Sequence, residues 1–309
     1  MRAFLYPGQG SQAVGMATDL FREDERFRAL IDHAESLVGR DLRTLCLRGP
    51  EKLLARTDLL QPLLVAVSLG YHRRLADRGI TPEAVAGHSL GEITALAAAG
   101  VVSDEAAVTL AAWRGELMQA AAADLDGGML AVVTDRREEF LSWFASAAPA
   151  GDVVVANDNA PGQLVLSGDR QILGEMAGRI AGKSLGRARF LDVAGPWHGP
   201  WMAQARDHFG LRAARIPFAP PRIPIVMNAT GRPSVDPAQV REHVVESIAA
   251  PVRWREVMER LREMDFATVV EVGPGRVLSG LARQNGLPAT TRIFPAGSLR
   301  GVEAAATSA

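Results

Sequence analysis

The chain of 309 residues is poor in cysteine and carries almost no net charge. Its one cysteine, Cys46, excludes an internal disulfide framework and fits a reducing cytosol. Its 34 basic and 35 acidic residues nearly cancel, so the basic footprint of a nucleic-acid-binding protein is missing. No charge-free apolar stretch approaches the length of a membrane span, and the N-terminal apolar run is too short for a signal peptide. We therefore expect a cytoplasmic protein with no membrane or nucleic-acid partner. We also expect a monomer, because no exposed apolar stripe stands out.

The 48% of hydrophobic residues allow one large core and a smaller inserted unit. Hydrophobic periodicity predicts a large α/β domain over residues 1–127 and 195–309. Between them, residues 128–194 show the order strand–helix–strand–strand–helix–strand, with a loop at "DNAPG" (158–162), which predicts a small ferredoxin-like (β-α-β-β-α-β) domain. The small, polar tail 301–309 is expected to be frayed.

The stretch "AVAGHSLGEITALAAAG" (84–100) raises the first functional question. Small apolar residues end a strand, helix formers follow, and Gly87 and Gly91 flank Ser89. This context fits the nucleophile elbow Gly-x-Ser-x-Gly, in which a serine stands on a tight strand-to-helix turn. The alternative is a serine that only caps the helix.

A serine nucleophile needs a base, and His198 is the best candidate among six histidines. It lies in "VAGPWHGPWM", a rigid aromatic loop directly after the small domain. The alternative is a packed loop histidine. His88 adjoins Ser89, but adjacent residues on such a turn usually point apart. The other four lie in charged helical stretches and are expected to be solvated: His33, His72, His208 and His243.

Arg114 falls on the apolar stripe of a helix predicted from Ser103 to Ala121. A guanidinium on a buried face is costly unless it is paired. It either pairs with a protein carboxylate or holds a substrate carboxylate in a bidentate fork. The second interpretation predicts an acidic substrate.

The glycine-rich turn "PGQGSQ" (7–12) also has two interpretations. A dinucleotide site is disfavoured, because helical spacing follows where a βαβ unit needs a second strand. An acyl-transfer oxyanion instead needs two backbone N–H donors. Leu90, after the nucleophile, would supply one and Gln9 the other.

Taken together, these segments resemble the malonyl-CoA:acyl-carrier-protein transacylases, the acyltransferases of fatty acid and polyketide synthesis. The resemblance runs almost from end to end and is carried by several motifs in the same order: "YPGQGSQ", "LLQPLL", "AGHSLGE", "WRGELMQ", "NDNAPGQLVLSG", "VAGPWHGPWM", "PVRW" and "EVGPG". It implies an α/β-hydrolase-like large domain with the small ferredoxin-like domain inserted.

The resemblance also implies a role for ten residues. Ser89 matches the nucleophile, His198 the catalytic base and Arg114 the residue that grips the malonyl carboxylate. The backbone N–H groups of Gln9 and Leu90 match the oxyanion donors. Four further positions match residues that line the acyl pocket: Gln61, Met118, Asn157 and Trp197. Trp197 stands where many malonyl-selective members have phenylalanine, and its bulk should disfavour a branched acyl group. Ser247 matches a glutamine whose backbone carbonyl orients the histidine.

By analogy the reaction is ping-pong, through a malonyl-serine. No cofactor and no metal are implied: malonyl-CoA is the substrate, and an acyl carrier protein brings its own phosphopantetheine thiol. The alternatives are a serine hydrolase that clears acyl groups from carrier proteins, a transacylase for methylmalonyl groups, a malonate decarboxylase subunit, and a non-catalytic adaptor that docks a carrier protein.

Overall fold

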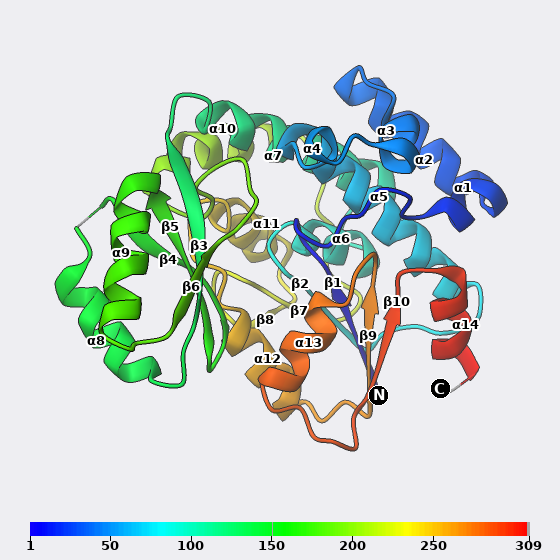
Figure 1. Cartoon of the computed structure of the whole chain (residues 1–309). Helices are drawn as coiled ribbons and strands as arrows, with labels where there is room; N and C mark the ends of the chain where they lie inside the picture. The colour runs from blue at the N-terminus through cyan, green and yellow to red at the C-terminus, as the bar shows by residue number, and fades with distance from the viewer. Residues whose placement is uncertain (150, 308–309) are drawn as a thin grey trace.

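The computed structural model describes residues 1–149 and 151–307 as an α/β protein with two sheets (Figure 1). The six-stranded sheet has the order β10-β9-β1-β2-β7-β8 and is parallel except for β8. Its strands are β1 (Arg2–Tyr6), β2 (Ala84–Gly87), β7 (Ile225–Val226), β8 (Pro233–Ser234), β9 (Thr268–Val272) and β10 (Arg292–Ala296). The antiparallel four-stranded sheet has the order β4-β5-β3-β6. Its strands are β3 (Gly127–Val133), β4 (Val153–Ala160), β5 (Gln163–Asp169) and β6 (Arg187–Phe190).

Helices precede and follow the four-stranded sheet along the chain. Those before the four-stranded sheet are α1 (Thr18–Glu23), α2 (Glu25–Val38), α3 (Leu42–Arg48), α4 (Glu51–Leu54), α5 (Thr57–Ala76), α6 (Gly91–Ala98) and α7 (Asp104–Ala121). Those that follow are α8 (Arg137–Ala147), α9 (Arg170–Gly182), the 3₁₀ turn η1 (Pro200–Met202), α10 (Ala203–Ala213), α11 (Pro237–Glu246), α12 (Trp254–Glu263), α13 (Val277–Gln284) and α14 (Leu299–Thr307). None of the described helices is long and apolar enough to cross a membrane.

The six-stranded sheet is buried on both faces, as expected for parallel strands. Successive side chains of β1 alternate between two cores. Phe4 and Tyr6 join the core that contains α2, α5 and α7, whereas Ala3 and Leu5 join the core formed with α12 and α13. The carboxyl ends of β1 and β2 therefore meet at one edge of a rigid sheet, where the turns that follow them lie together.

The four-stranded sheet has the element order expected from the sequence, and α8 and α9 pack with it around a separate core (Figure 1). One detail of the prediction is wrong: the expected "DNAPG" loop continues β4 as far as Ala160, so only a short turn remains before β5. Pairing explains the difference, because Asn157, Asp158 and Ala160 pair with residues of β5. Beyond the small sheet, Asn157 forms a parallel bridge with Val252, which joins the two units at the backbone.

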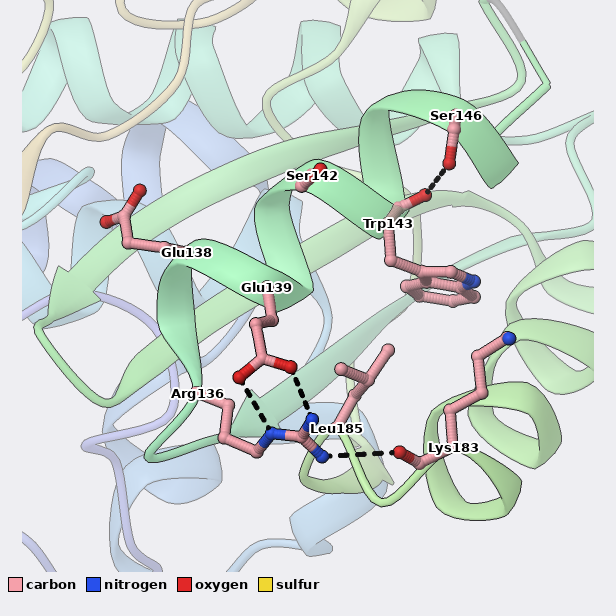
Figure 2. A pocket seen from close by; sticks show the side chains of 8 residues that line it. All are labelled: Arg136, Glu138, Glu139, Ser142, Trp143, Ser146, Lys183 and Leu185. Carbon is pink, nitrogen blue, oxygen red and sulfur yellow. Dashed lines mark hydrogen bonds and ion pairs between the residues drawn. The ribbon is translucent and has the colours of Figure 1, made fainter.

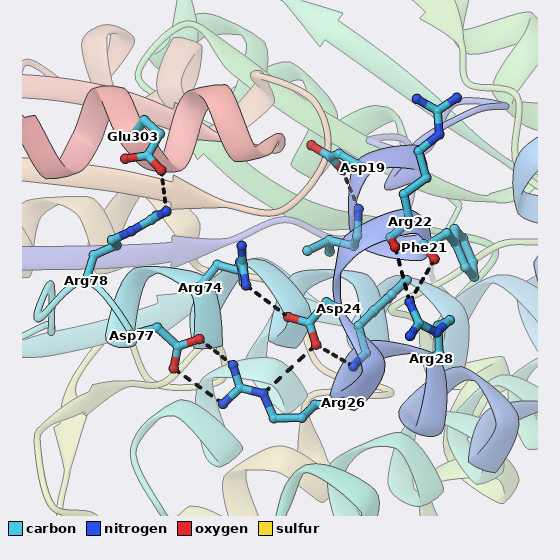
Figure 3. Close-up of polar contacts among 12 residues, drawn as sticks. Asp19, Phe21, Arg22, Asp24, Arg26, Arg28, Arg74, Asp77, Arg78 and Glu303 are labelled. Atoms are coloured by element: carbon cyan, nitrogen blue, oxygen red, sulfur yellow. Dashed lines mark hydrogen bonds and ion pairs between the residues drawn. The ribbon is translucent and has the colours of Figure 1, made fainter.

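The tail prediction is also wrong for residues 301–307, which form α14, while 308–309 lie outside the described residues. Val302 and Ala305 are buried in the core. Figure 3 shows Glu303 of this helix paired with Arg78, which follows α5. Asp19 accepts hydrogen bonds from the backbone N–H of Leu299 at 2.6 Å and the hydroxyl of Tyr71 at 2.8 Å. Small apolar side chains and a carboxylate that caps the helix start thus order the segment.

Candidate active site

Ser89 stands on the turn between β2 and α6 with a φ of 50°, in the left-handed region that is strained for a residue with a side chain. The flanking glycines are required by space. A Cβ on Gly91 would lie 2.0 Å from the carbonyl oxygen of Tyr6, and one on Gly87 would lie 1.9 Å from the backbone of Gly91. Leu90, not Ser89, is the N-cap of α6. The geometry is that of a nucleophile elbow, not of a capping serine.

His198 lies at the elbow, with its Nε2 2.7 Å from the Oγ of Ser89. Its Nδ1 lies 2.8 Å from the carbonyl oxygen of Ser247. A carbonyl only accepts, so Nδ1 carries the proton and Nε2 is free to accept the serine proton. Burial, and then the nearby Arg114 charge, lower the pKa of His198 to about 3, so the ring is neutral near pH 7. This is the state that a general base needs.

Arg114 is 1% exposed on α7, as the apolar stripe predicted. Its Nη1 donates to the Oε1 of Gln61 at 3.0 Å, and its Nη2 donates to the Oγ of Ser89 at 3.1 Å. Burial lowers its pKa to about 10, against the attraction of Glu92, so it stays charged at neutral pH. Within the part of the chain that the structure describes, it forms no ion pair within 4.0 Å. A buried guanidinium whose partners are neutral can receive a carboxylate from a substrate.

A chain of polar side chains extends from Arg114 toward the glycine-rich turn. Gln61 donates through Nε2 to the Oε1 of Gln9 at 3.1 Å and contacts the Sδ of Met118 at 3.5 Å. Gln9 in turn donates to the Oγ1 of Thr57 at 3.2 Å. Gln61, Met118 and Gln9 are thus brought together with Arg114.

The glycine-rich turn packs directly on the elbow. A Cβ added to Gly8 would lie 2.6 Å from the carbonyl oxygen of His88 and 3.7 Å from the backbone nitrogen of Leu90. Among residues 1–149 and 151–307, the backbone N–H groups of Gln9 and Leu90 have no hydrogen-bond acceptor. Two unused donors on neighbouring turns beside Ser89 are the requirement for an oxyanion hole.

Trp197 and Asn157 are both buried, 4% and 6% exposed. The indole Nε1 of Trp197 and the Oδ1 of Asn157 have no hydrogen-bond partner in the described residues. Trp197 precedes His198, and Asn157 lies on β4 where the small sheet bridges to Val252. Neither hydrogen-bonds to Ser89 or Arg114 in the described chain, so their place in an acyl pocket stays a prediction.

The expectation of solvated helical histidines is wrong for His72. Its Nδ1 lies 2.9 Å from the hydroxyl of Tyr6, its ring packs against Phe4, and burial lowers its pKa to about 4. The helix that carries His72 packs on the six-stranded sheet. The charged residues next to His72 in the sequence gave no sign of this packing. His208 is exposed as expected, and His88 points away from Ser89 toward Asn159.

Two buried residues behind the elbow received no role from the sequence, Asn228 and Glu92. Asn228 accepts a hydrogen bond from the backbone N–H of Ser89 at 2.9 Å. One sequence signal for Asn228 exists: it is a polar residue two positions after the end of β7, at the edge where the carboxyl ends of the parallel strands meet.

An open hollow of about 700 Å³ lies elsewhere, between α8 and the turn after α9 (Figure 2). Arg136, Trp143 and Lys183 line it, and Arg136 is already paired with Glu139. It contains none of the predicted site residues. No cluster of three or more His, Cys, Asp or Glu side chains suited to a metal occurs in the described part of the chain.

A serine on an elbow with a histidine nitrogen at hydrogen-bond distance defines a class of α/β enzymes that carry an acyl group on serine. The model of the acyl transferase domain family matches residues 3–289. The chain belongs to this family, and within it to the malonyl-CoA:acyl-carrier-protein transacylases.

Relatives and solved structures support the assignment over nearly the whole chain. The malonyl CoA-acyl carrier protein transacylase of Bacillus subtilis is 34% identical over 284 residues, which cover 91% of this chain and 89% of the relative. The crystal structure of the malonyl-CoA:acyl carrier protein transacylase of Xanthomonas oryzae is 36% identical, with a TM-score of 0.92 and coverage of 99% and 98%. A malonyl-transacylase in complex with a type II polyketide synthase acyl-carrier protein is 31% identical, with a TM-score of 0.92 and coverage of 100% and 99%.

Proposed function

We propose that this protein transfers a malonyl group from malonyl-CoA to the phosphopantetheine thiol of an acyl carrier protein. The observation that carries the proposal is that His198 and Arg114 both hydrogen-bond to the Oγ of Ser89. The names of the relatives, and the solved complex of a transacylase with its carrier protein, support the same reaction and partner.

In the first half-reaction, Oγ of Ser89 attacks the thioester carbonyl carbon while Nε2 of His198 takes the hydroxyl proton. The carbonyl oxygen becomes an oxyanion that receives hydrogen bonds from the N–H groups of Gln9 and Leu90. The carbon–sulfur bond then breaks, and CoA leaves with the proton from His198. In the second half-reaction the carrier-protein thiol gives its proton to His198, and its sulfur attacks the carbonyl carbon of the malonyl-serine. The bond from that carbon to Oγ then breaks, and His198 returns the proton to Oγ of Ser89.

Arg114 selects the substrate in this mechanism. Its guanidinium binds the malonyl carboxylate in a bidentate fork, and Gln61 holds the guanidinium by accepting a hydrogen bond from Nη1. A hydrolase for uncharged acyl groups would have no use for a buried cation beside its nucleophile, so Arg114 favours the transacylase.

Met118, Asn157 and Trp197 would line the acyl pocket. The burial of all three and the contact of Met118 with Gln61 support this assignment. Trp197 would leave little room for a methyl branch beside the carboxylate, which favours malonyl over methylmalonyl groups.

The proposal also covers the domain organisation, the oligomeric state and the cellular location of the protein. We propose an α/β-hydrolase-like large domain, 1–127 and 195–309, with a ferredoxin-like domain, 128–194, inserted. The separate core that the four-stranded sheet forms with α8 and α9 supports this division. We further propose that the protein is a monomer and that it is cytoplasmic. The single cysteine, which is free and buried, supports the cytoplasmic location.

The test is carrier-protein loading. Holo-acyl carrier protein is mixed with malonyl-CoA and catalytic amounts of enzyme, and the malonyl mass shift of the carrier is followed with time. We expect loading by the wild type and none by Ser89→Ala. If the enzyme instead strips malonyl groups from a pre-loaded carrier without transferring them, the hydrolase is correct.

A further inference from the structure

A buried asparagine holds the back of the nucleophile elbow. Asn228 follows β7 and is fully buried. Its side-chain Oδ1 accepts from the N–H of Ser89 at 2.9 Å, and its Nδ2 donates to the carbonyl of Gly87 at 2.6 Å. One amide thus binds the backbone at Gly87, where β2 ends, and at Ser89, the residue with the positive φ.

The chemistry of the partners fixes the orientation of this amide. The N–H of Ser89 can only donate, and the carbonyl of Gly87 can only accept, so Oδ1 and Nδ2 cannot exchange places. A carboxylate at position 228 would keep the acceptor for Ser89 but would place a second acceptor against Gly87.

Glu92 completes the arrangement from the first turn of α6. Its Oε1 accepts from the backbone N–H of Asn228 at 2.6 Å and from Nδ2 of Asn228 at 2.8 Å. Glu92 is 1% exposed, and its Oε2 has no hydrogen-bond partner among the described residues. Because Oε1 accepts two bonds, any proton on this carboxyl belongs on Oε2.

The surroundings of Glu92 favour the protonated form. Burial raises its pKa to about 7, while the hydrogen bonds from Asn228 and the charge of Arg114 oppose that rise. Oε1 can accept both hydrogen bonds from Asn228 whether or not Oε2 carries a proton.

We propose that Asn228 and Glu92 are positioning residues that hold the strained backbone of Ser89, and with it the N–H of Leu90, in the reactive geometry. Asn228 binds the elbow and Glu92 orients the Asn228 amide. Neither touches the acyl group. The proposal rests on Ser89 being the nucleophile of the proposed function, and it adds two residues to which the reaction chemistry gives no role.

The positioning role predicts a particular pattern of kinetic change. The φ of 50° at Ser89 is held by a buried hydrogen bond that no other described side chain supplies. Without it, the nucleophile and the Leu90 donor lose alignment in the transition state, while the carboxylate site at Arg114 is unchanged. We expect kcat for malonyl transfer to fall at least tenfold with KM within about threefold.

The experiment uses a fluorophosphonate probe, which labels reactive serines and needs no malonyl group. Labelling rates and thermal midpoints are measured for the wild type, Asn228→Asp, Glu92→Gln and Glu92→Leu, with Ser89→Ala as the unlabelled control. Asn285→Asp is the matched control, because Asn285 is also a buried asparagine whose Nδ2 bonds to backbone carbonyls, at 2.8 and 2.9 Å, away from the elbow.

We expect Asn228→Asp and Glu92→Leu to label at least tenfold more slowly, and Glu92→Gln to stay within about threefold of the wild type because its amide oxygen can accept the same two bonds. Asn285→Asp should label at the wild-type rate. Wild-type labelling in folded Asn228→Asp would overturn the proposal. Should that variant not fold, equal rates for Glu92→Gln and Glu92→Leu would overturn it. A wild type that labels but does not transfer malonyl would refute the proposed function alone.

Discussion

Replacing Arg114 tests substrate selection directly. Arg114→Met removes the guanidinium but keeps most of the buried stem, so little cavity is created. Arg114→Lys keeps a cation but loses the planar fork. We expect both variants to lose activity toward malonyl-CoA, with the methionine variant losing more, and to retain activity toward acetyl-CoA.

The magnitude follows from the contacts. A bidentate fork makes two charge-assisted hydrogen bonds of about 1.5–3 kcal/mol each, so its loss costs about 3–6 kcal/mol. If the proposed fork replaces the 3.1 Å bond from the guanidinium to Ser89, the net cost lies at the lower end of this range. At 1.36 kcal/mol per factor of ten, kcat/KM for malonyl-CoA should fall about 10²- to 10³-fold.

The assay is CoA release under single-turnover conditions, with malonyl-CoA and acetyl-CoA measured in parallel. The ratio of the two rates reports the clamp independently of any general loss of folding. An equal fall for both substrates in a folded Arg114→Met variant would refute the clamp, because it would mean that Arg114 supports Ser89 and not the acyl carboxylate.

Three further predictions concern the elbow, the base and the pocket. Gly91→Ala should lower the thermal midpoint sharply because its Cβ would meet the carbonyl of Tyr6, whereas Gly174→Ala, with open space around it, should not; equal midpoints would contradict the packing. His198→Gln should lower kcat about 10²- to 10⁴-fold. The pKa of His198 in the fold lies below its usual value, so its contribution to the free energy of unfolding is present above pH 6.5 and is lost as the pH falls toward 3. Urea titrations should therefore show that the free energy of unfolding falls less steeply with acid in the glutamine variant than in the wild type. Trp197→Phe should raise the methylmalonyl-to-malonyl rate ratio, and an unchanged ratio would remove Trp197 from the pocket.

Sequence patterns predicted the features of this site that depend on residues close together in the chain. The elbow follows from two glycines around Ser89, and the burial of Arg114 follows from helical spacing along α7. Asn228 could not be predicted in this way, because its partner Ser89 lies 139 positions away and only the pairing of β2 with β7 brings them together. The prediction that His72 is solvated was wrong for a related reason. Its charged neighbours on α5 indicated an exposed position, and its contact with Tyr6 on the sheet is distant in sequence.

The most direct test of the central claim is intact-protein mass spectrometry after incubation with malonyl-CoA, methylmalonyl-CoA and acetyl-CoA in parallel, with Ser89→Ala as the control. Free CoA is measured in the same tubes, so that rapid turnover is distinguished from an inactive site. We predict a malonyl adduct on the wild type, none on Ser89→Ala, and little adduct from the other two substrates. An adduct from acetyl-CoA without one from malonyl-CoA, or a malonyl adduct that persists in Ser89→Ala, would contradict the account.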